Sequence, residues 1–246
     1  MNPDSPYFTY PLPGIAEPMS AISHLFAAFV FAVMAFVLVR QAGSDRRRAR
    51  AIKLYACSVV ALLLTSGIYH LFSRDLVIRD VLQRLDHATI FVVIASTFTA
   101  IHTVLLEGLW RSGVLALVWA LAAIGIFISL VLLNTVPESV CLGFYLGLGW
   151  LGMLTGVLLW IRFGFLFVKP LILGAFAYTG GAVVDFLREP VLISGVVGSH
   201  ELFHLAVLAG LGYHWKFISS FAHQAVVQCP ETRSFMLIPR ELSIER

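Results

Sequence analysis

Histidines are the residues of this chain best suited to chemistry, and several stand at helical spacing. His200 and His204 are four residues apart, which places both imidazoles on one face of a helix. Ser66 and His70 show the same spacing in another apolar stretch. Three imidazoles with an open fourth position are typical of a catalytic zinc site. We therefore predict that His70, His200 and His204 bind Zn²⁺.

Asp86 and Ser66 are the predicted catalytic residues beside that metal. Zinc lowers the pKa of bound water from about 15.7 to about 7, and a nearby carboxylate can orient that water or carry its proton. Asp86 opens a third apolar stretch, and the Ser66 hydroxyl could hydrogen-bond Asp86 or the water. Glu201 lies between His200 and His204 in the sequence, points off their common face and is a weaker candidate.

The remaining polar residues of the apolar stretches have other interpretations. Glu17 and His24 stand at the beginning of the first stretch. We interpret His87 as a residue that supports the site or lies at the membrane interface. His102 and His214 lie deeper along their helices, where we expect interhelical hydrogen bonds.

Apolar helices must position these groups, because the composition excludes a soluble protein. Hydrophobic residues make up 59% of the 246 residues and charged residues 13%, against about 25% charged residues in soluble domains. The apolar runs do not alternate as barrel strands would, and each is long enough to cross a hydrocarbon core of about 30 Å as a helix. We predict an all-α membrane protein, a seven-transmembrane helix bundle with an intramembrane metal site. The expected spans are approximately 20–40, 52–72, 82–106, 112–133, 140–163, 170–187 and 196–221.

The predicted domain organisation is an N-terminal segment (1–19), a helical domain (20–221) and an unpatterned C-terminal tail (222–246). Glycines at helical spacing in the fifth span favour close packing within the bundle, and a dimer contact is the alternative, so a homo-oligomer stays open. They are Gly143, Gly147, Gly152 and Gly156. Basic residues cluster in short loops without interleaved aromatics, which excludes nucleic acid as a partner.

Chain topology brings the polar groups to one membrane depth. Alternating crossings place the beginning of the first span, the end of the second, and the beginnings of the third and seventh on the same side. Ionisable groups inside a membrane are costly and indicate a functional site. Orientation follows from the first loop, whose arginines Arg46, Arg47, Arg48 and Arg50 predict a cytoplasmic loop and C-terminus, with the N-terminus outside.

Four segments together resemble the hemolysin III family, part of the progestin and adipoQ receptor superfamily that includes the adiponectin receptors. The resemblance spans nearly the whole chain, although Ser20 and Ser23 stand where the family usually shows Asn and Thr. It implies zinc ligands at His70, His200 and His204, with Ser66 and Asp86 alongside, and a relation to the alkaline ceramidases. The segments are Glu17-Pro-Met-Ser-Ala-Ile-Ser-His24, Ser66-Gly-Ile-Tyr-His70, Leu85-Asp86-His87 and His200-Glu-Leu-Phe-His204.

The leading functional hypothesis is a zinc-dependent integral-membrane hydrolase. Its substrate would be an amide or ester of a long-chain lipid, reached through the bilayer, with zinc-bound water as the nucleophile. One alternative is a receptor or signalling bundle in which zinc is structural, which a fourth protein ligand would favour. The other is a membrane-perturbing or lipid-homeostasis protein.

Overall fold

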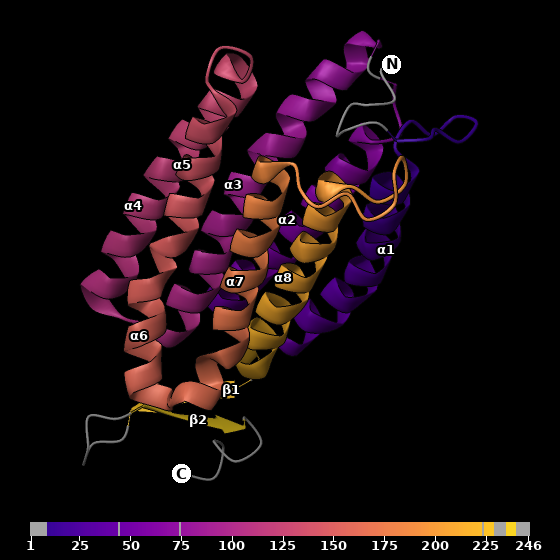
Figure 1. Cartoon of the computed structure of the whole chain (residues 1–246). Helices are drawn as coiled ribbons and strands as arrows, with labels where there is room; N and C mark the ends of the chain where they lie inside the picture. The colour runs from indigo at the N-terminus through magenta and orange to yellow at the C-terminus, as the bar shows by residue number, and fades with distance from the viewer. Residues whose placement is uncertain (1–8, 44, 74, 223, 229–234, 240–246) are drawn as a thin grey trace.

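A computed structural model of the chain describes residues 9–43, 45–73, 75–222, 224–228 and 235–239. Within these residues the fold is built from long apolar helices and one short hairpin (Figure 1). Helices suit a membrane because every backbone polar group is bonded within its own segment. The elements in chain order are α1 (Pro18–Gln41), α2 (Arg46–Tyr69), α3 (Val77–Leu105), α4 (Gly108–Phe127), the π-helical turn η1 (Ile128–Leu132), α5 (Glu138–Trp150), α6 (Gly152–Phe163), α7 (Phe165–Leu187), α8 (Ser199–Ala222), β1 (Gln224–Gln228) and β2 (Phe235–Pro239).

Six of the seven expected spans are long and apolar enough to cross a membrane. They are α1, α2, α3, α4 with η1, α5 with α6, and α7. Helix α8 has 24 residues, so its length also suffices, but it falls outside this set. Its polar residues lower its mean hydropathy, namely His200, Glu201, His204, His214 and Lys216.

Neighbouring helices in the chain are mostly neighbours in space, and α8 closes the bundle. Helix α2 packs between α1 and α3, and α3 also packs on α4. Helix α8 packs extensively along α7 and also contacts α1, α2 and α3 (Figure 1). The last helix therefore lies against the first three, which is the arrangement that lets residues from both ends of the sequence meet.

Glycines permit the closest helix contacts, but not the glycines that the sequence indicated. A Cβ added to Gly67 of α2 would lie 2.7 Å from Leu25 of α1, so these helices touch at that point. A Cβ at Gly143, Gly147 or Gly156 would meet nothing within 4 Å. The prediction that these three pack helices together was wrong. At Gly156 the reason is that the residue lines a cavity instead.

Two element boundaries also differ from expectation. Helix α7 begins at Phe165 and continues through Pro170, where we expected the span to start. Proline removes only one backbone hydrogen bond in this position, the one to residue 166 in the first turn. The tail was expected to be unpatterned, yet β1 and β2 pair antiparallel, with Val226 opposite Leu237. Both strands are short apolar runs, which suit a hairpin.

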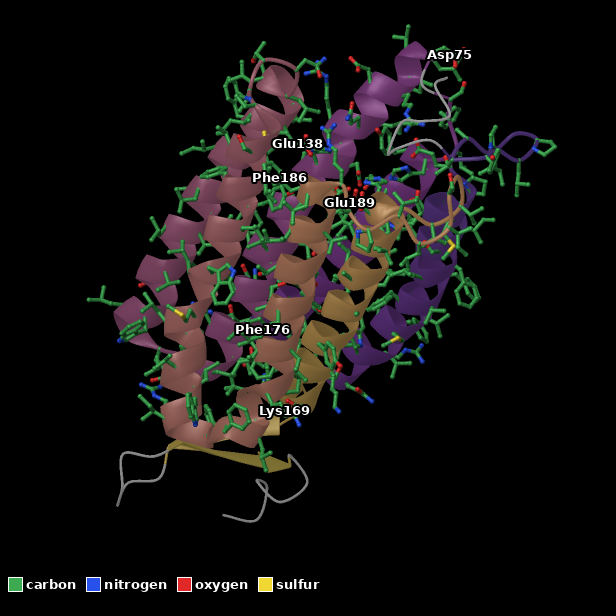
Figure 2. All side chains as sticks on the ribbon, in the orientation of Figure 1. Asp75, Glu138, Lys169, Phe176, Phe186 and Glu189 are labelled. Carbon is green, nitrogen blue, oxygen red and sulfur yellow. The ribbon has the colours of Figure 1, made fainter. Side chains whose placement is uncertain are left out.

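The helix ends that carry the polar groups meet at one end of the bundle. In Figure 1 the beginnings of α1, α3 and α8 and the ends of α2 and α7 all lie towards the top. Figure 2 shows Asp75, Glu138 and Glu189 at this end and Lys169 at the opposite end. The predicted clustering of these helix ends is therefore found in the fold.

Candidate metal centre

Three imidazoles form the only such group of possible metal ligands among the described residues. One ring nitrogen from each of His70, His200 and His204 lies within 4.8 Å of the other two. The Nε2 atoms of His200 and His204 are 3.1 Å apart. The centroid of the His70 ring lies 5.2 Å from that of His200 and 4.6 Å from that of His204. His70 ends α2 while the other two lie in the first turns of α8, so the site joins distant segments.

Each of the three imidazoles is held through its Nδ1 atom. His70 Nδ1 bonds the Glu17 carboxylate, and His200 Nδ1 lies 3.2 Å from Asp185 Oδ1. A carboxylate accepts only, so both Nδ1 atoms carry the proton and donate. His204 Nδ1 lies 2.8 Å from His24 Nε2. Residues at the beginning of α1, inside α1 and near the end of α7 thus hold the three rings.

For His70 and His200 this bonding makes Nε2 the unprotonated ring nitrogen. An imidazole whose Nδ1–H donates to a carboxylate presents an unprotonated Nε2, which is the form that binds a metal. Two nitrogens about 2.0–2.1 Å from a tetrahedral zinc ion would be about 3.3 Å apart. The 3.1 Å between His200 and His204 Nε2 is close to that value. The donor set therefore fits Zn²⁺, although the identity of the metal stays a prediction.

Glu17 reaches His70 because the local backbone brings it there. Pro18 occupies the first position of α1, and the Glu17 side chain makes no cap hydrogen bond to the helix. Its backbone N–H instead donates to the His70 carbonyl at 3.1 Å, and Ala16 N–H donates to the Leu71 carbonyl at 3.1 Å. The segment entering α1 is therefore tied to the end of α2 at the site itself.

Glu17 stays ionised although it is buried. Burial alone would raise the pKa of its carboxyl group. The hydrogen bond from His70 and the positive charge of Arg79 act against burial and hold that pKa below its ordinary value.

Asp86 and Ser66 lie together beside the imidazoles. Both line the same cavity as the three histidines, and the Ser66 hydroxyl is close enough to donate a hydrogen bond to the Asp86 carboxylate. Ser66 is buried at 3% exposure. The structure thus places both residues as the topology predicted, and their catalytic role stays a prediction.

His102 and His214 form hydrogen bonds between helices. His102 Nδ1 donates to the Trp110 carbonyl at 2.7 Å, so its Nε2 accepts from the Thr155 hydroxyl at 3.0 Å. His214 Nε2 lies 3.2 Å from the Leu171 carbonyl of α7. The expected interhelical bonds of His102 and His214 are confirmed.

Glu201 belongs to the beginning of α8 rather than to the imidazole cluster. It accepts from Gly198 N–H at 2.9 Å and from the Ser20 hydroxyl at 3.4 Å. His87 lines the cavity, and the role that we gave it stays a prediction.

A large cavity runs from the imidazoles into the bundle. Its volume is about 1160 Å³, which exceeds the roughly 300–1,000 Å³ of ordinary ligand pockets. Polar side chains line the end at the histidines, and the remainder of the wall is mostly apolar and extends to Trp160 and Ile172. The glycines Gly152 and Gly156 also line it. Such a cavity suits a molecule with a polar group at one end and a long apolar body.

Sequence reasoning missed Asp185 and Arg79 as parts of this centre. Asp185 precedes the α8 histidines by an irregular loop, so no helical spacing connects them. No spacing rule pointed to Arg79, whose side chain is buried against Glu17. The signal available for Asp185 was an ionisable group at the end of an apolar run.

Comparisons of the sequence with known proteins identify related proteins. A family model described as Haemolysin-III related matches residues 15–215. The chain is 26% identical over 163 residues to a Hemolysin-3 homolog of Bacillus subtilis (strain 168), covering 64% of this chain and 70% of that protein. It is 27% identical over 197 residues to Hemolysin-3 of Bacillus cereus, covering 79% and 86% respectively. The matched segment runs from just before α1 to near the end of α8 and contains every residue of the candidate centre; the chain belongs to the haemolysin-III related family of multi-pass membrane proteins.

Proposed function

We propose that this protein is a zinc-dependent hydrolase that cleaves an amide or ester of a long-chain lipid inside the bilayer. The observation that carries the proposal is the position of the three imidazoles at the polar end of the cavity. A lipid with its acyl chain along the apolar wall would present its carbonyl group to that end. His70, His200 and His204 are the residues that would hold the metal.

Zinc in such a site supplies Lewis acidity, which polarises a carbonyl group and lowers the pKa of water. The side chains of the protein carry the proton and orient the reacting groups. Asp86 accepts the proton of the attacking water and returns it to the departing nitrogen or oxygen, so that water adds across the broken C–N or C–O bond. The Ser66 hydroxyl orients the Asp86 carboxylate for that transfer.

The test uses purified protein and fluorescent ceramide-like amides and matched esters. The expected result is turnover that stops when zinc is removed by a chelator and returns when zinc is added. Asp86→Asn is expected to lower the rate by about 10²–10⁴-fold while bound zinc stays near the wild-type amount. Zinc-loaded wild-type protein that turns over no lipid amide or ester would refute the proposed activity.

We further propose that α8 is the seventh span and that the first loop and the C-terminus are cytoplasmic. Its 24 residues make a helix of about 36 Å, and it packs among spans α1, α2, α3 and α7. Cysteine labelling in intact cells tests the orientation with Gln41→Cys beside the first loop and Leu192→Cys in the loop before α8, both exposed. With the native cysteines replaced by serine, an impermeant reagent should label only Leu192→Cys. Labelling of Gln41→Cys alone would reverse the orientation.

A membrane-perturbing activity is the second candidate, because the relatives carry the names Hemolysin-3 and Hemolysin-3 homolog. Release of dye from vesicles by added protein distinguishes the two candidates. Release that persists in Asp86→Asn and in zinc-free protein would favour perturbation over hydrolysis.

A further inference from the structure

Arg79 is a buried arginine whose contacts all converge on the segment that carries His70. It lies in the first turn of α3 and is 6% exposed. Its Nη2 donates to Glu17 Oε1 at 2.6 Å, and its Nη1 donates to the Phe72 carbonyl. Its guanidinium carbon also lies 4.4 Å from the centre of the Tyr69 ring. A buried guanidinium is costly unless it is paired and hydrogen-bonded, as this one is.

These partners surround the metal-ligand candidate in the sequence. Tyr69 immediately precedes His70, and Phe72 follows it by two residues. Glu17 joins the two groups directly, since one carboxylate oxygen accepts from Arg79 and the other accepts from His70 Nδ1. The guanidinium therefore contacts three groups around His70. These are the Phe72 carbonyl after it, the Tyr69 ring before it and the Glu17 carboxylate that is hydrogen-bonded to it.

We infer that Arg79 is a positioning residue of the metal centre, which fixes His70 through Glu17 so that Nε2 of the imidazole faces His200 and His204. The inference rests on the zinc site of the proposed function but not on hydrolysis. The pathway runs from the Phe72 carbonyl through Arg79 and Glu17 to His70.

Charge explains why an arginine is needed here. Glu17 is 5% exposed and His70 is 1% exposed, so water cannot compensate the carboxylate. Arg79 supplies the opposite charge within hydrogen-bonding distance of Glu17. Without it, the buried carboxylate would have no positively charged partner and would move towards water, which would release the imidazole that Glu17 orients.

Geometry explains why lysine does not suffice. The two terminal nitrogens of one planar guanidinium bond Glu17 and the Phe72 carbonyl at the same time. A lysine ammonium carries the charge but lacks the planar fork and the flat surface that stacks on Tyr69. Arg79→Lys should therefore keep only part of the zinc affinity that is lost in Arg79→Gln.

The experiment measures zinc affinity in the full-length purified protein by competition with a chelator. Arg79→Gln is expected to weaken zinc binding by about 10–100-fold, the usual cost of losing a group that orients a ligand, and Arg79→Lys by less. The visible spectrum of the Co²⁺-substituted protein should change in both variants because the imidazole geometry changes.

The matched control is Arg84→Gln, an arginine of the same helix that donates to the Leu130 carbonyl and pairs with Asp80, away from the imidazoles. This control should keep wild-type zinc affinity and the wild-type Co²⁺ spectrum. Glu17→Gln should resemble Arg79→Gln, and the double variant should be little worse than either single one, since both interrupt one pathway.

Wild-type zinc affinity in folded Arg79→Gln and Arg79→Lys would overturn the inference. If Arg79→Gln does not fold, the zinc affinities of Arg79→Lys and Glu17→Gln test the inference instead. Wild-type protein that binds no zinc would refute both this inference and the proposed function. Zinc binding without hydrolysis would refute only the proposed function.

Discussion

Asp185 and His200 join the last two helices side chain to side chain, with 3.2 Å between Oδ1 of the aspartate and Nδ1 of the histidine. The aspartate lies near the end of α7 and the histidine near the beginning of α8, so the bond spans the irregular loop between the two helices. It fixes the tautomer of His200 in which Nε2 is unprotonated, the form that binds a metal. Asp185 does for His200 what Glu17 does for His70.

Removal of the Asp185 carboxylate should therefore weaken zinc binding. Asp185→Ala is expected to cost about 10–100-fold in zinc affinity. Asp185→Asn should cost less, because its amide oxygen still accepts from His200 Nδ1. Isothermal titration with zinc measures both effects. Glu138→Gln is the control, since Glu138 is an exposed carboxylate at the same end of the bundle, and equal losses in Glu138→Gln and Asp185→Ala would contradict the role given to Asp185.

Replacement of two histidines of α8 should have very different effects on zinc binding. His204→Ala removes a proposed ligand, and its loss of zinc affinity should exceed the roughly 10–100-fold expected for an orienting group. His214→Ala removes a hydrogen bond to the Leu171 carbonyl and should leave bound zinc unchanged. Elemental analysis of the purified variants gives the zinc content. Stoichiometric zinc in His204→Ala would show that the ligand set is different.

Adjacent glycines of α7 offer a test of how closely α7 and α8 pack. A Cβ at Gly181 would lie 2.5 Å from the Ala206 Cβ, whereas one at Gly180 would meet nothing within 4 Å. Gly181→Ala should lower the free energy of unfolding by about 1–3 kcal/mol, because the helices must separate. Gly180→Ala should leave it unchanged or raise it by up to about 1 kcal/mol. Thermal unfolding in detergent measures both, and equal stability in the two variants would contradict this packing.

The hydrogen bond between His102 and Thr155 should make a modest contribution to stability. Thr155→Val removes the hydroxyl that donates to His102 Nε2 and keeps the shape of the side chain. Interhelical hydrogen bonds in membranes are worth about 0.6 kcal/mol on average and at most about 1.7 kcal/mol. We expect a loss of unfolding free energy in that range, without a change in zinc content. A fall in bound zinc would mean that this bond acts on the metal centre.

The sequence predicted the helices and the meeting of the histidines for definite physical reasons. Apolar runs bounded by charge are long enough to mark spans, and a four-residue spacing fixes which side chains share a face. Alternating crossings then set the depth of each polar group. His70 and the pair on α8 follow from these rules, and the structure brings their nitrogens together.

The sequence could not predict contacts between residues that no regular spacing connects. Arg79 lies well before Asp86 on α3 and could not be assigned to the site, because burial of a guanidinium depends on tertiary contacts, here with Glu17 and Phe72. The glycines were misread for a similar reason. A small residue permits close packing, but only the course of the neighbouring helix decides whether it occurs at Gly181 or at Gly156.

The distribution of the three imidazoles along the chain also orders the events of biosynthesis. The ribosome makes α2, with His70, long before it makes α8, which carries His200 and His204. A nascent chain that stops before α8 inserts has only one of the three imidazoles, held by Glu17 against the start of α1. Capture of the predicted metal would therefore belong to the end of assembly, and a bound ion would mark a molecule whose final helix has docked.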